Sequence, residues 1–211
     1  SLKWDFRGAF HDVSTAVAAS FLDQKMDLIG HSFGASVALR LALEHPDLVR
    51  SLILIEPVIF SLGFAFEPAS KQAFLHDHSE FNRAIAREEF VGAARAFHQL
   101  WGSGQSWDRL PDKVQRGMVD KIHLIPAAAS HVVEDAYGFC TAGLLEKIEA
   151  PVLLLQGSAS SAPMPAVISS LQARLPRSLV NTLEGAGHMA PITHAKATAA
   201  HIQSFLKKHP V

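Results

Sequence analysis

Four short apolar runs, each next to a segment with helical spacing, limit this chain to an α/β architecture. We expect strands at 26–29, 49–55, 151–156 and 178–183. Residues 1–5 are interpreted as the tail of a further strand. The run at 49–55 is almost continuously apolar, which is typical of a strand covered on both faces. Strands that alternate with helices predict a mostly parallel, doubly wound sheet.

The helices are predicted from apolar residues that recur at intervals of three and four. We expect them at 12–23, 32–45, 81–101, 112–123, 167–175 and 193–208. Residues 60–145 contain no strand-like run, so we interpret them as an inserted helical cap. The core is then discontinuous and consists of residues 1–59 and 146–211. A chain of 211 residues is long enough for one core and a small lid.

Composition excludes several classes of protein. The chain is 48% apolar and 18% charged with a net charge of −1, which argues against disorder, nucleic-acid binding and anionic-membrane binding. No uncharged apolar run reaches the roughly 18 residues of a membrane span. Cys140 is the only cysteine, which excludes an internal disulfide and a cysteine-based zinc site. One thiol fits a reducing, cytoplasmic location. A homodimer is compatible with the sequence, which does not determine the oligomeric state.

The pentapeptide Gly30-His31-Ser32-Phe33-Gly34 matches Gly-x-Ser-x-Gly and lies between an expected strand and an expected helix. This is the context of a nucleophile elbow, a tight turn that exposes the serine hydroxyl. We expect both glycines to be required because side chains there would collide with the strand and the helix. The backbone N–H of Phe33 is then expected to donate to an oxyanion. The alternative is a serine N-cap with glycines for packing.

A serine hydroxyl needs a general base, and the chain has 12 histidines. His188 follows the expected strand 178–183 through a Gly-x-Gly turn, so it lies at the carboxyl end of a strand, where catalytic groups of parallel sheets gather. We therefore expect His188 to be the base. His31 adjoins the serine, but its side chain should point away from the hydroxyl, and we assign it to substrate binding.

This arrangement resembles the α/β-hydrolase family. The loop Asp5-Phe6-Arg7-Gly8 is similar to the Asp-x-Arg-Gly loop after that family's fourth strand, and the resemblance extends over the whole chain. It implies the α/β-hydrolase fold with a helical cap. It also implies that the first strands and a second oxyanion donor lie upstream of Ser1, so we expect the native protein to have further residues there.

The family's usual acid, an Asp in the loop after the penultimate strand, is replaced here by Ser160. The best substitute is Glu56, at the end of the strand 49–55, where haloalkane dehalogenases and some other family members place their acid. Glu184 is the rival, and a Ser–His dyad without an acid is the third alternative.

Serine at the elbow suits acyl transfer, whereas dehalogenases and epoxide hydrolases need a carboxylate nucleophile. We expect a cofactor-independent, metal-independent hydrolase of a carboxylic ester or related small acyl substrate. Its pocket should be mostly apolar, with Phe60, Trp101 and Met189 in contact with the substrate. A C–C bond hydrolase and a non-catalytic ligand-binding protein of the same fold are the alternatives.

Overall fold

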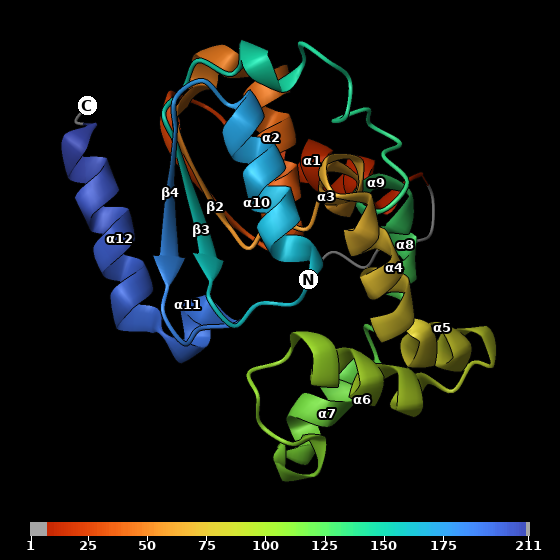
Figure 1. The fold of residues 1–211 in the computed structure, drawn as a ribbon. Coiled ribbons are helices and arrows are strands. Elements are labelled where there is room, and N and C mark those ends of the chain that lie inside the picture. Colours follow the sequence, from red (N-terminus) through yellow and green to blue (C-terminus); the bar gives the residue numbers. More distant parts are fainter. Residues whose placement is uncertain (1–7, 210–211) are drawn as a thin grey trace.

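The computed structural model describes residues 8–209, in which four parallel strands form one sheet with helices on both faces (Figure 1). The strands follow each other in the order β1-β2-β3-β4. Their bounds are Met26–His31, Val49–Ile55, Val152–Gly157 and Ser178–Leu183. All four expected strands are therefore present. The strand expected at 1–5 and most of the Asp5-to-Gly8 loop lie outside the described residues.

Alternate side chains of β2 point to opposite faces of the sheet. Leu52 and Leu54 pack in a cluster with side chains of α2 (Phe33–Glu44) and α10 (Pro163–Arg174). Ile53 and Ile55 instead pack beside Phe205 of α12 (Ala195–Lys208). The almost continuous apolar run is explained by this burial on two sides.

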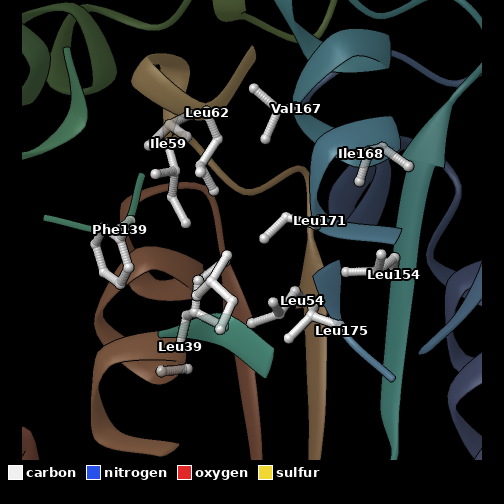
Figure 2. Close-up of a cluster of buried hydrophobic side chains, with 14 of the residues drawn as sticks. Leu39, Leu54, Ile59, Leu62, Phe139, Leu154, Val167, Ile168, Leu171 and Leu175 are labelled. Atoms are coloured by element: carbon white, nitrogen blue, oxygen red, sulfur yellow. The ribbon is translucent and has the colours of Figure 1, made fainter. Parts of the chain in front are cut away.

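The main core lies between the sheet and the helices α2 and α10. Figure 2 shows Leu39 of α2, Leu54 of β2, Leu154 of β3 and Leu171 of α10 converging there, and all four are fully buried. Truncating such a leucine to alanine costs about 2–5 kcal/mol of stability, so this cluster holds the strand ends in fixed positions. The same side of the sheet carries α1 (Phe10–Ala19), which contacts α2.

Between β2 and β3 the described chain is helical. The α-helices of this insert, α3 to α9, span Phe60–Phe66, Pro68–Asp77, Ser79–Ala86, Phe90–Trp101, Asp112–Val119, Leu124–Ala127 and Ala129–Val132. The single helix expected at 81–101 was wrong: it is divided into α5 and α6. The division occurs at Glu88, whose φ of 57° is incompatible with a continuous right-handed helix.

The last expected helix, 193–208, is present as α12, which begins two residues later, and Thr193 ends the short separate helix α11 (Ala190–Thr193). None of the helices in the described part of the chain is both long and apolar enough to cross a bilayer. Since all four strands are parallel, their carboxyl ends lie along one edge of the sheet, and the segments that follow them meet there.

Candidate active site

Ser32 occupies the turn between β1 and α2. Its φ of 57° and ψ of −124° are unusual for a residue with a side chain. The turn is held by three backbone hydrogen bonds. The Ser32 N–H donates to the Ile55 carbonyl at 2.9 Å, and the Ser32 carbonyl accepts from the Ala35 N–H at 3.0 Å and from the Val58 N–H at 3.5 Å. Such strain persists only where the surrounding structure enforces it, and it clusters at functional sites.

The two glycines of the turn differ in their surroundings. A Cβ on Gly30 would lie 2.4 Å from the Gly34 carbonyl oxygen and 2.5 Å from the Ala35 Cα, so no side chain fits. A Cβ on Gly34 would meet no atom within 4 Å. The expectation of a collision therefore holds at Gly30 and is wrong at Gly34, because the second residue of α2 points its hydrogen away from the strand.

His188 comes to Ser32 from the loop after β4. Its Nε2 lies 2.9 Å from the Ser32 Oγ, and its ring is 7% exposed. The neighbouring His31 holds the same loop, since its Nε2–H donates to the His188 carbonyl at 2.7 Å. Burial lowers the pKa of His31, which keeps this ring neutral at neutral pH.

Glu56 follows β2 directly and is completely buried. Its Oε2 accepts a hydrogen bond from His188 Nδ1 at 3.2 Å. Its Oε1 accepts two more, from the Gly157 N–H and the Ser160 hydroxyl, each at 2.7 Å. A buried carboxylate is tolerable only with such partners, and these three donors surround the charge.

Glu184, the rival acid, lies elsewhere. It is exposed, and its Oε1 accepts from the Ser158 hydroxyl at 3.1 Å. Ser160, which stands at the family's usual acid position, instead supplies a donor to Glu56. From the sequence alone Ser160 is recognisable only as a missing acid, because its hydrogen bond depends on a contact between two distant loops that no local pattern reveals.

Phe33 is the first residue of α2, where a backbone N–H has no partner within its own helix. This places a donor, and the positive end of the helix dipole, beside the Ser32 hydroxyl. The Phe33 ring packs between Phe10 and His11 of α1, with centroid separations of 5.2 Å and 5.3 Å. These contacts fix the start of α2.

A cavity of about 360 Å³ opens onto Ser32 and His188. Its walls come from the core and the helical insert, and no charged Lys, Arg, Asp or Glu is among the described residues that form them. Phe60 and Trp101 line it as expected. Further apolar walls are Val58, Phe74, Phe81, Ile85, Phe97 and Val132.

Two of the expected substrate contacts lie outside this cavity. Met189 lines a second cavity of about 260 Å³, which also borders His188, together with four glycines and several hydroxyl side chains. His31 lines neither cavity, because its ring is directed at the His188 backbone.

One cluster in the described chain has the composition of a metal site: His11, Asp12 and His131 bring their ligand atoms within 4.8 Å of one another. Arg40 donates to the Asp12 carboxylate and lies 3.3 Å from His11 Nδ1. A guanidinium already neutralises this carboxylate, so the residues fit a structural network between α1, α2 and α9 better than a metal ion.

Comparisons with known proteins agree with this geometry. Residues 4–195 match the family model for the alpha/beta hydrolase fold. A pimeloyl-[acyl-carrier protein] methyl ester esterase of Neisseria meningitidis serogroup A is 32% identical over 206 residues, covering 91% of this chain and 60% of the relative. A serogroup B esterase of the same name is 30% identical, covering 90% of this chain and 72% of the relative.

Solved structures share the fold at lower identity. A serine hydrolase involved in carbazole degradation superposes with a TM-score of 0.67 at 17% identity, covering 98% of this chain and 74% of that one. A bacterial membrane phospholipase A has a TM-score of 0.65 at 22% identity, with coverages of 96% and 64%.

Proposed function

Because the chain belongs to the alpha/beta hydrolase family, we propose that it is a serine hydrolase that cleaves a carboxylic ester or a related acyl compound. One observation carries the proposal. The His188 imidazole is hydrogen-bonded to the Ser32 hydroxyl at 2.9 Å and to the Glu56 carboxylate at 3.2 Å. Ser32 and His188 also border a cavity. Nucleophile, base and orienting acid are the parts that acyl transfer requires.

In the first half-reaction the Ser32 Oγ attacks the substrate carbonyl carbon, and its proton moves to His188 Nε2. The resulting imidazolium is stabilised by Glu56, whose carboxylate is itself held by Gly157 and Ser160. The carbonyl oxygen becomes an oxyanion beside the Phe33 N–H. The tetrahedral intermediate then collapses, His188 returns the proton to the leaving alcohol, and the acyl group remains on Ser32.

In the second half-reaction a water molecule attacks the acyl-serine and gives its proton to His188. Collapse of the second tetrahedral intermediate releases the carboxylic acid and restores the Ser32 hydroxyl. No redox change or cofactor enters either step.

The position of Glu56 supports it as the acid, ahead of Glu184 and ahead of a dyad. It is the carboxylate bonded to His188 Nδ1, which fixes the tautomer with the Nε2 lone pair toward Ser32. Glu184 is bonded to Ser158 on the surface.

The substrate class follows from the cavity. The relatives named as pimeloyl-[acyl-carrier protein] methyl ester esterases are similar to most of this protein. The serogroup A relative is longer, and this protein covers 60% of its length. We assign the larger cavity to an apolar acyl chain, because its walls are aromatic and aliphatic and carry no charged side chain. Residues 60–145 then act as the cap that covers the acyl chain of the substrate.

The proposal is tested with p-nitrophenyl esters and a fluorophosphonate probe. Wild type should hydrolyse the esters and be labelled on Ser32, whereas Ser32→Ala should lose both, with turnover reduced by about 10⁶-fold. Unchanged activity in Ser32→Ala would refute the assignment. A protein that folds but is neither labelled nor active would favour the non-catalytic alternative, and turnover confined to ring-cleavage diketones would favour the C–C bond hydrolase.

The acyl-site assignment has its own test in a series from acetate to octanoate. Each methylene that enters the cavity should raise kcat/KM about fourfold, because burying a CH₂ is worth roughly 0.8 kcal/mol. Ala128→Phe places a larger side chain in the cavity and should remove this gain for the longer esters. The kcat/KM for the acetate ester should stay unchanged and serves as the internal control. If kcat/KM of wild type does not change from the acetate to the octanoate ester, the acyl chain binds outside this cavity.

A further inference from the structure

Trp101, the last residue of α6, lies directly against His188. The two ring centroids are 4.9 Å apart with an interplanar angle of 72°. Trp101 is 5% exposed and also contacts Phe60 at a centroid separation of 5.5 Å. One side of the imidazole is thus covered by an indole that belongs to the helical insert rather than to the sheet.

The orientation of this indole is set by a hydrogen bond to a second histidine. The Trp101 Nε1–H donates to His78 Nε2 at 2.9 Å, between two side chains that are both more than nine-tenths buried. His78 precedes α5 and has no contact with Ser32 or Glu56 among the interactions of the described residues.

The state of His78 is fixed in turn by Phe74 of α4. The His78 Nδ1–H donates to the Phe74 carbonyl at 2.8 Å, and the two rings stack at 3.9 Å. A neutral imidazole that donates through Nδ1 has a lone pair on Nε2, which is what the indole N–H requires. Burial lowers the pKa of His78, so the neutral form prevails at neutral pH.

We propose that His78 is a positioning residue for the general base: by accepting the indole N–H it holds Trp101 against His188 and keeps that ring directed at Ser32. The inference rests on the proposed function, since it concerns the same base. It connects three cap elements, α4, α5 and α6, to the orientation of one side chain of the core.

The physical basis is the cost of an unpaired donor. If His78 offers no acceptor, the buried indole N–H loses its partner, and an unsatisfied donor is unfavourable where water cannot replace that partner. The indole then turns toward another partner or toward water, and the covered side of His188 opens. His188 populates other rotamers, so the Ser32–His188 hydrogen bond is formed for a smaller fraction of the time and kcat falls.

The test measures kcat and KM for p-nitrophenyl acetate, whose two-carbon acyl group limits contact with the cavity wall that His78 also forms. His78→Leu should lower kcat about tenfold and leave KM within about twofold. His78→Gln should recover a large part of this loss, because its Oε1 can accept the indole N–H. Trp101→Phe removes the donor and should resemble His78→Leu.

The matched control is His98→Leu. His98 is an equally buried histidine on α6 that bonds to the Gln105 carbonyl and packs on Trp107, away from His188. It should lower the Tm of the protein and leave kcat within about twofold of wild type. A general loss of cap packing would instead affect His78→Leu and His98→Leu alike.

The double variant His78→Leu/Trp101→Phe adds a second criterion. Both substitutions break the same hydrogen bond, so the double variant should have a kcat within about twofold of the worse single variant, whereas independent effects would multiply. The inference is overturned if His78→Leu folds and has the kcat of wild type. If His78→Leu does not fold, a wild-type kcat in Trp101→Phe overturns the inference instead. Wild-type protein that neither turns over ester nor reacts with fluorophosphonate would instead overturn the proposed function.

Discussion

The Ser160 hydroxyl donates a hydrogen bond to Glu56 Oε1 at 2.7 Å, so the residue that stands where the family usually has an acid supports a carboxylate that follows a neighbouring strand. Glu56 follows β2 and Ser160 follows β3, and these strands are paired in the sheet. The buried carboxylate of this site thus lies at the end of β2, and the loop after β3 contributes a hydrogen-bond donor to it.

Replacing Glu56 by Gln should lower kcat by about 10⁴-fold. An amide in this place cannot stabilise the imidazolium. With its oxygen on the donors of Gly157 and Ser160, its N–H₂ group faces His188 Nδ1 and favours the wrong tautomer of the imidazole. The measurement is steady-state hydrolysis of p-nitrophenyl butyrate, with circular dichroism to show that the variant folds.

Glu184→Gln is the control for this substitution, because that side chain is exposed and bonded to Ser158. It should keep wild-type kcat. The reverse result, an active Glu56→Gln and an inactive Glu184→Gln, would transfer the role of the acid to Glu184.

Ser160→Ala should reduce both stability and turnover. It removes one of three donors from a fully buried carboxylate, and hydrogen bonds to charged groups contribute about 1.5–3 kcal/mol. Urea unfolding should show a loss of this size, and kcat should fall about tenfold. Ser160→Thr keeps the hydroxyl and should retain most of both quantities. Equal losses in the two variants would mean that the hydroxyl is not what matters.

The two glycines of the turn should respond in opposite ways to alanine. Gly30→Ala drives a Cβ into the backbone of α2 and should cost about 3 kcal/mol or prevent folding. Gly34→Ala meets open space in a helix, where alanine is favoured by roughly 0.5–1 kcal/mol, and should raise the Tm slightly. Thermal unfolding of both variants checks the pair, and a destabilised Gly34→Ala would contradict it.

Acid should destabilise the protein through His11. Burial, followed by the nearby His131 and Arg40, lowers the pKa of His11 to about 4, from an ordinary value of 6.5. Between these two values the unfolded chain binds a proton that the folded chain does not, so the free energy of unfolding falls as the pH drops from 6.5 toward 4. Urea unfolding at a series of pH values measures this slope.

His11→Gln should make the slope between pH 7 and pH 4 flatter. Some slope remains, since burial lowers the pKa of His31 and His78 in the same direction. His76→Gln, at an exposed position, serves as the control and should leave the slope unchanged. If His11→Gln shows the same dependence of unfolding free energy on pH as wild type, His11 does not contribute to that dependence.

The strands and the proposed catalytic residues Ser32 and His188 could be predicted from the sequence for a physical reason. A strand buried on both faces has a continuous apolar run, and the residue that ends such a run lies at the edge of the sheet where the other ends lie. Glu56 follows a run of this kind, and Ser32 and His188 follow the less buried strands β1 and β4, so the parallel topology places all three at one edge of the sheet.

The supporting contacts were not accessible in this way. The bonds from Ser160 to Glu56, from His31 to the His188 carbonyl and from Trp101 to His78 each join segments whose spacing depends on how loops are packed. The break between α5 and α6 depends on one left-handed residue, Glu88, in a segment whose apolar spacing is otherwise continuous. Local periodicity carries no information on either.

Two residues of the proposed triad, Ser32 and Glu56, have positive φ values of 57° and 51°. Conformations of this kind cost about 1–3 kcal/mol each for residues other than glycine. If the proposed triad is correct, turnover and heat resistance compete in this molecule, because glycine at either position would relieve the backbone and remove a group of the triad. Selection for thermal tolerance alone would then remove two side chains on which the proposed hydrolysis depends.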